Sequence, residues 1–116
     1  MSQILIKMTP TTQGWAALIE KPQNRFEAIR PMFEEHGDMK LLDYWFAVDQ
    51  NAVYLHIEGT ENLTHQLSIV IAALGSGAFS SMETTRLLTA AEAVEAMKLA
   101  KSQGYRSPTG TTPQKK

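Results

Sequence analysis

Hydrophobic residues recur with two different periods along this chain, and the period predicts the type of each element. A period of two, which gives a strand two distinct faces, runs through residues 3–8 and most strictly through residues 52–58. Residues 40–48 are apolar at both alternating sets of positions, which indicates a strand with both faces covered. The threonine- and leucine-rich residues 79–88 predict a fourth strand. Asp49–Asn51 predicts a hairpin turn between the second and third strands, because asparagine tolerates positive φ.

Apolar residues spaced three or four positions apart predict the helices. Thr9 and Pro10 are typical of an N-cap and a first helical position, so the first helix is expected to begin there. Pro22 interrupts it, and a second helical piece that ends at His36 contains Pro31, which predicts a kink or a break in that piece. Residues 62–74 are apolar on more than one stripe, which predicts a helix buried on more than one side. Gly75 then fits the left-handed position at a helix C-terminus.

A terminal helix completes the pattern. Thr89 and Glu92 form a capping box that opens a helix running to about Gln103. The resulting order, β-α-β-β-α-β with an additional C-terminal helix, is that of an α+β ferredoxin-like fold with the expected strand order 4-1-3-2. Helices cover one face of such a sheet and leave the other open. Exposing an apolar open face to water costs free energy in proportion to its area, so we predict a homodimer or higher homo-oligomer paired through the sheets.

Composition limits the classes of function. The 116 residues are 43% hydrophobic and 20% charged, as in an ordinary single domain, and the formal net charge of −1 gives no reason to expect nucleic acid or anionic lipid as a partner. The absence of cysteine excludes disulfides, thiolate zinc ligands and thiol nucleophiles, and it is compatible with the cytoplasmic location that we expect. No signal-peptide pattern is present, and the longest apolar run, residues 69–74, is far shorter than the ~20 residues of a membrane helix.

Charge is distributed unevenly along the chain. Three of the 11 basic residues and no acidic residue lie in residues 104–116, which leaves residues 1–103 with a net charge of −4. The same segment contains four glycine or proline residues and no aliphatic side chain, so it cannot offset its own ordering entropy. We therefore predict a single domain over residues 1–103 and a disordered basic tail over residues 104–116.

Several stretches together resemble one known family. They begin with Thr11–Gly14 and Lys21–Phe26, continue with Leu41–Phe46 and Ala72–Gly77, and end with Glu83–Thr89. In their order and spacing they are similar to the GYD-domain proteins, a small bacterial and archaeal family of the dimeric α+β barrel group. The resemblance implies a ferredoxin-like fold, association as a dimeric α+β barrel and a bacterial type of protein. It implies no established reaction.

The hairpin for which the family is named is replaced in this chain. Where relatives carry Gly-Tyr-Asp or Gly-x-Tyr-Asp, residues 49–52 read Asp-Gln-Asn-Ala. Whatever those three residues do in relatives is therefore not expected here.

One candidate site follows from the strict alternation of the third strand, which places Tyr54, His56 and Glu58 on one face. Lys7 on the first strand and Glu83 on the fourth are in position to share that face. Such a set could transfer protons or bind a ligand, since imidazole exchanges protons near neutral pH. The alternative that we favour is a hydrogen-bonded polar patch between two sheets. His56 and Glu58 supply only half of a zinc site, so no metal is expected.

A second candidate site uses the aromatic residues. Trp15 on the first helix and Tyr44 or Phe46 on the second strand are in position to line a cleft between sheet and helices, where barrel relatives often hold ligands. The alternative is plain core and interface packing. Two functions remain open: an association module or weak binder of a small apolar or aromatic molecule, and a cofactor-free enzyme of the barrel monooxygenase or isomerase kind. The second needs a cavity with a histidine or tyrosine inside, and neither function calls for a cofactor.

The other two histidines have no functional partners that the sequence suggests. His36 is expected at a helix C-terminus, where a cation suits the helix dipole. His65 is expected in the first turns of the next helix, exposed to solvent.

Overall fold

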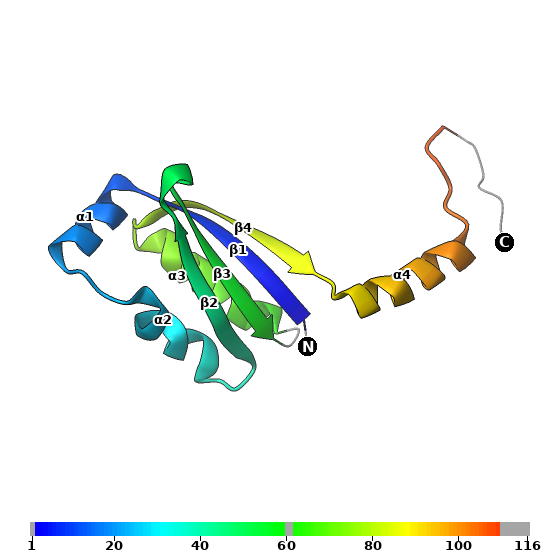
Figure 1. Cartoon of the computed structure of the whole chain (residues 1–116), viewed down its shortest axis with the longest axis horizontal. Coiled ribbons are helices and arrows are strands. Elements are labelled where there is room, and N and C mark those ends of the chain that lie inside the picture. The colour runs from blue at the N-terminus through cyan, green and yellow to red at the C-terminus, as the bar shows by residue number, and fades with distance from the viewer. Residues whose placement is uncertain (1, 60–61, 110–116) are drawn as a thin grey trace.

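The computed structural model describes residues 2–59 and 62–109, and the predicted order of elements is confirmed over these ranges (Figure 1). The first helix of the pattern is divided in two, α1 and α2, at the segment that contains Pro22. The elements are β1 (Ser2–Pro10), α1 (Thr12–Glu20), α2 (Arg25–Glu34), β2 (Met39–Ala47), the short 3₁₀ turn η1 (Val48–Gln50), β3 (Ala52–Gly59), α3 (Leu63–Gly75), β4 (Phe79–Leu87) and α4 (Ala90–Gln103).

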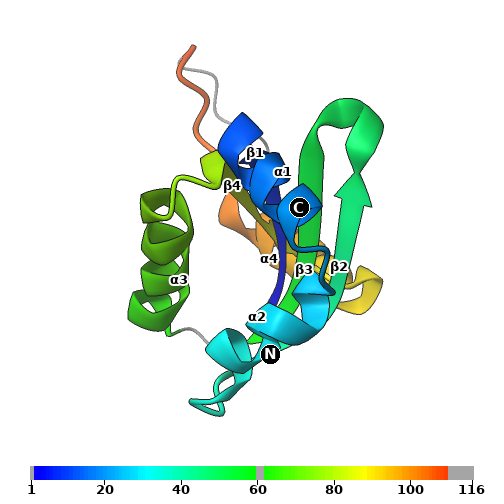
Figure 2. The same ribbon diagram turned by 90° about the vertical axis from the view of Figure 1, so that its left-hand side faces the viewer.

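The four strands form one antiparallel sheet in the order β2-β3-β1-β4, which is the predicted order. One face of the sheet carries the core. The alternation of β1 and β3 holds as predicted, and α2 and α3 each contribute one buried apolar side chain to the same face. Figure 2 shows α3 and the β2–β3 hairpin at opposite sides of the domain. The buried core residues are Ile4, Ile6, Met8, Phe33, Met39, Leu41, Val53, Leu55, Ile57 and Ile69.

The first helix begins later than predicted. Thr9 and Pro10 still belong to β1, where a register shift between them marks an irregular end of the strand. Thr11 is the N-cap instead: its hydroxyl accepts from the Gly14 N–H at 3.0 Å and donates to the Gly77 carbonyl at 2.7 Å. The prediction of Thr9 as the cap was wrong because the cap is selected by this contact with the α3–β4 loop, which is remote in sequence.

The residues of β2 are distributed between the two faces of the sheet differently from the prediction. Leu42 has no partner on β3, so β2 bulges at that residue. The bulge brings Asp43 opposite His56 and Trp45 opposite Tyr54, on the face away from the core. The open face therefore receives a carboxylate as well as an aromatic ring, and it is less apolar than the sequence indicates.

The structure bears on two further helical predictions. The α2 helix continues through Pro31, so of the predicted kink or break the break is absent. In α3, Gly75 is the last helical residue, Ser76 is the C-cap, and the left-handed backbone is at Gly77, with φ of 81°.

The α3 helix is also less buried than its composition suggests, since within this chain only Ile69 is fully buried. Val70 is half-buried, and four other large apolar side chains stay 42–70% exposed, because α3 packs mainly beside the edge strand β4 and not flat on the sheet. These exposed residues are Leu63, Leu67, Ile71 and Leu74.

The α4 helix projects away from the sheet (Figure 1). Its predicted capping box is confirmed: Thr89 Oγ1 accepts from the Glu92 N–H at 3.1 Å, and the Glu92 carboxylate accepts from the Thr89 N–H at 2.9 Å. These bonds hold the pKa of Glu92 below its ordinary value. The helix contains no buried residue. It raises the Cα radius of gyration to 18.6 Å, against roughly 13 Å for a compact domain of this length.

Beyond α4, residues 104–109 contain no helix or strand. The rest of the predicted tail, residues 110–116, lies outside the described residues. Over the described ranges, no helix combines the length and the apolar character needed to cross a membrane.

Candidate functional site

The open face of the sheet brings the first set of predicted residues together. Tyr54, His56 and Glu58 lie on it with Lys7, which stands opposite Tyr54 on one side and Glu83 on the other. Lys7 Nζ is 3.9 Å from a Glu83 carboxylate oxygen. The strand register thus assembles a polar surface across three strands.

Gln3, which the sequence did not single out, organises this surface. Its amide nitrogen donates to the Glu58 carboxylate at 2.9 Å, and its amide oxygen is 2.7 Å from Nε2 of His56. Because a carboxylate can only accept, the amide orientation is fixed, and Nε2 of His56 must carry the proton that it donates to Gln3. Nδ1 of His56 faces the Asp43 carboxylate at 3.6 Å. Each polar group has a partner, and none of the hollows described below opens on this face.

The second set of residues adjoins a cleft between the sheet and the helices α1, α2 and α3. The cleft consists of two hollows of about 200 and 240 Å³. They adjoin, since five residues line both: Arg25, Tyr44, Ser76, Ala78 and Phe79. The first hollow reaches the core residues Ile6, Leu55 and Ile69, and the second reaches Leu18, Phe46 and Val53. Of the predicted residues, Tyr44 and Phe46 line the cleft directly.

Trp15 supports the cleft without lining it. Its ring lies 5.8 Å from the Phe46 ring between centroids, and Phe46 in turn lies 5.3 Å from Tyr44. The indole N–H donates to the Asn51 side-chain oxygen at 2.7 Å, and the Asn51 amide donates to the Pro10 carbonyl at 3.2 Å. Trp15 thereby fastens α1 to the β2–β3 turn and holds the aromatic row in place.

Tyr44 and Arg25 are the polar groups at the centre of the cleft. Burial raises the pKa of Tyr44, and the neighbouring Arg25 guanidinium offsets only part of that effect, so the pKa of Tyr44 stays above its ordinary value. The tyrosine is therefore a protonated hydrogen-bond donor at neutral pH. Arg25 is the first residue of α2, and it donates to the Gln23 amide oxygen at 2.6 Å. Sequence reasoning did not select Arg25, because nothing in its spacing shows that it faces a cleft.

A third hollow of about 270 Å³ lies between α3 and the β1–β4 side of the sheet. Leu63, Leu67 and Val70 of α3 form one wall, and Thr84 and Arg86 of β4 form another. It exists because α3 stands away from the strands that it covers. None of the seven predicted site residues lines this hollow.

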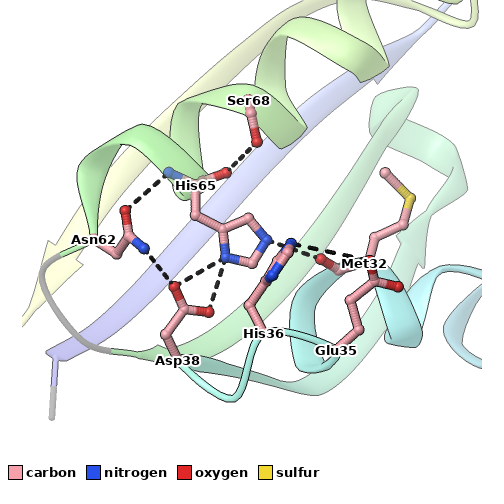
Figure 3. Close-up of polar contacts among 7 residues, drawn as sticks. All are labelled: Met32, Glu35, His36, Asp38, Asn62, His65 and Ser68. Carbon is pink, nitrogen blue, oxygen red and sulfur yellow. Dashed lines mark hydrogen bonds and ion pairs between the residues drawn. The ribbon is translucent and has the colours of Figure 1, made fainter.

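His65 is the centre of a polar cluster that the sequence did not predict (Figure 3). Its side chain is only 10% exposed, and Nδ1 lies 2.8 and 3.0 Å from the two Asp38 oxygens. Nε2 lies 3.1 Å from the Met32 carbonyl oxygen. Both partners are acceptors, so only an imidazole that carries a proton on each nitrogen donates both bonds. The expectation that His65 is exposed and unpartnered was wrong, because Asp38 and Met32 come from segments remote in sequence.

The carboxylate of this cluster is also held by the N-cap of α3. The Asn62 amide donates to Asp38 at 2.8 Å, while the Asn62 side-chain oxygen accepts from the His65 backbone N–H at 3.1 Å. Burial alone would raise the pKa of Asp38, but the hydrogen bonds and charge of His65, together with the Asn62 bond, leave that pKa below its ordinary value. The cluster thus joins α2, the α2–β2 loop and the start of α3.

The cluster contains serine, histidine and aspartate, but its geometry is not that of a nucleophilic triad. The Ser68 hydroxyl donates to the His65 main-chain carbonyl at 2.7 Å, and the histidine nitrogen that a nucleophile would need faces Met32 (Figure 3). His36 stacks edge-on against the His65 ring at 4.5 Å and is itself 62% exposed in its side chain. We interpret the cluster as a structural tie.

No set of three or more metal-ligating side chains capable of holding an ion occurs in residues 2–59 and 62–109. Comparisons with known proteins add no assignment: no family model, curated protein or solved structure matches this chain. The resemblance to GYD-domain proteins stays a prediction.

Proposed function

We propose that this chain is a homodimeric α+β module whose cleft binds a small apolar or aromatic molecule. The observation that carries the ligand proposal is the cleft itself, two adjoining hollows between sheet and helices with mostly apolar walls and with Tyr44 lining both. Concave, mostly apolar sites with a few polar groups are the usual form of small-molecule sites. The two hollows, of about 200 and 240 Å³, favour a ligand the size of about one aromatic ring.

The binding test uses a neutral aromatic probe and a variant that fills the cleft. Benzyl alcohol should bind with a Kd on the order of 1 mM, as expected for so few atoms, and should shift backbone amide resonances along Tyr44–Phe46 and Ser76–Phe79. Ala73→Leu adds three carbons at the wall of the first hollow and should abolish those shifts.

Ala16→Leu is the matched control, because Ala16 is exposed on α1 and outside the cleft lining. The proposal fails if benzyl alcohol shifts no cleft resonance, or if the two variants bind it equally.

Two features support the homodimer. The open face exposes 55% of Trp45 amid a row of charged side chains that offer both signs, including Lys7 and Glu83. The α4 helix, which contains no buried residue, exposes Val94 and Met97 by 46 and 66%. A second copy of the chain would cover the apolar residues of the open face and of α4, and would bring charges of opposite sign to Lys7 and Glu83. We propose pairing through the open sheet faces, as in the barrel group that the chain resembles.

Sedimentation velocity of the full chain at about 10 μM tests this arrangement, with the monomer mass of 12.9 kDa as reference. Trp45→Glu on the open face should shift the protein towards monomer. Ile19→Glu is the control: it introduces the same charge at an apolar residue that is 77% exposed on α1, and should leave the oligomeric state unchanged. A parent protein that sediments as a monomer, or equal effects of both variants, would refute pairing through this face.

The enzyme alternative keeps one supporting observation. A tyrosine lies in the cleft, as that hypothesis requires, and Arg25 beside it is a donor suited to a developing negative charge. His56 lies on the opposite face of the sheet and cannot act on the same molecule within one chain. The structure therefore favours binding over proton-transfer chemistry in the cleft.

A further inference from the structure

The residues that line the cleft include a positive charge and no negative charge. Arg25 is the only charged residue among those that line either hollow, and the remaining walls are apolar apart from Tyr44, Ser76 and Gln23. A guanidinium has five N–H donors, of which Gln23 accepts one at 2.6 Å and the Tyr44 hydroxyl oxygen accepts another, which leaves donors for a ligand. Over residues 2–59 and 62–109, Arg25 forms no ion pair with a carboxylate, whereas Arg30 on the same helix pairs with Glu27 and Glu34.

A cation beside an apolar cavity favours a ligand that is anionic at one end and apolar at the other. The ligand needs one anionic group for the guanidinium and an apolar body for the walls. The protonated Tyr44 hydroxyl is a second donor next to the same position. Planar carboxylates match the forked geometry of arginine, and the rings of Tyr44, Phe46 and Phe79 offer faces and edges to an aromatic body.

We propose that the cleft selects a small aromatic carboxylate, with Arg25 and Tyr44 holding the carboxylate and the ring lying among the apolar walls. This inference rests on the proposed ligand-binding function and specifies the chemical class of the ligand. It assigns Arg25 as the residue that determines the preference for an anion.

The experiment compares benzoate with benzamide, two ligands of nearly the same shape that differ in charge, at constant ionic strength by titration calorimetry or amide chemical shifts. The unchanged protein should bind benzoate about tenfold more tightly than benzamide, the effect of one charge-assisted hydrogen-bonded pair. Arg25→Met should remove that preference and leave benzamide binding unchanged. Arg30→Met is the matched control, because it removes an arginine of the same helix whose partners are exposed carboxylates, and it should keep the tenfold preference.

The outcomes separate this inference from the function on which it rests. Equal binding of benzoate and benzamide by the unchanged protein refutes the carboxylate assignment while preserving the cleft as an apolar site. Binding of neither ligand, nor of benzyl alcohol, refutes both. If circular dichroism shows Arg25→Met to be unfolded, Arg25→Lys gives the deciding variant: it keeps the charge but not the fork, so a preference for benzoate that is reduced but retained supports the proposal. A preference for benzoate fully retained in Arg25→Met places the anion elsewhere and refutes it.

Discussion

Replacing His65 by alanine should destabilise the domain far more than replacing the neighbouring His36. The His65 side chain is only 10% exposed, and it donates to both the Asp38 carboxylate and the Met32 carbonyl. Removing it takes away a nearly buried ring together with both of its hydrogen bonds, which costs about 1–3 kcal/mol. For a domain of this size that corresponds to a loss of roughly 5–15 °C in Tm.

Thermal unfolding followed by circular dichroism measures this difference directly. His36→Ala is the matched control, since the His36 side chain is 62% exposed and its nearest carboxylate, that of Glu35, is 3.9 Å away. Its Tm should stay within about 2 °C of the parent, the usual range for exposed substitutions. Equal Tm values for His65→Ala and the parent would show that the polar cluster does not tie α3 to the domain.

The same cluster predicts a pH dependence with a definite sign. The pKa of Asp38 is lower in the folded protein than its ordinary value of 3.8. A carboxylate of this kind stabilises the fold above its unfolded pKa, and that contribution is lost as the pH falls through the folded value. The parent should therefore lose stability below about pH 4 more steeply than Asp38→Asn, which cannot titrate. Parallel pH profiles for the two proteins would contradict the assignment.

Three further predictions concern other parts of the chain. Deleting Ser107–Lys116 should leave Tm and oligomeric state unchanged, because Tyr105 before it is 69% exposed and the described contacts of Ser107 are local; a Tm loss of several degrees would show that the segment docks. His56→Ala leaves the Gln3 amide oxygen without its donor on the open face, so it should weaken dimerisation about tenfold in sedimentation equilibrium, against no change if the face is free. Asn51→Gly keeps the turn but removes the indole partner of Trp15, so it should shift tryptophan fluorescence to longer wavelength; an unchanged spectrum would contradict the tie.

The sheet could be predicted from the sequence because its information is local. In β3, Val53 and Ile57 alternate with Tyr54 and His56, and a period of two leaves no choice of face. The order of elements followed from such runs and from turn residues. The bulge at Leu42 could not be predicted in the same way, because an extra residue in one strand leaves the local pattern nearly unchanged and is visible only in its pairing with β3.

The same distinction between local patterns and contacts between elements applies to the candidate sites. Tyr54 and His56 were placed correctly because strand periodicity determines which side chains share a face. Arg25 and the partners of His65 were missed because their significance depends on contacts between elements: a helix that begins beside a cleft, and a loop carboxylate that meets the next helix. No spacing within one segment encodes such a meeting. Burial of α3 was overestimated for a related reason, since apolar composition shows that a helix needs cover but not which molecule supplies it.

The turn between β2 and β3 connects local backbone chemistry to the cleft. Asn51 adopts a left-handed conformation with φ of 52°, which glycine adopts freely and asparagine tolerates among the other residues. Unlike glycine, asparagine brings a side chain to that position, and here its two ends bind Trp15 of α1 and the Pro10 carbonyl. The ring of Trp15 then packs on Phe46, which lines the cleft. The Asn51 side chain thus fastens α1, and the wall of the proposed ligand site depends on a turn residue that does not itself line the cleft.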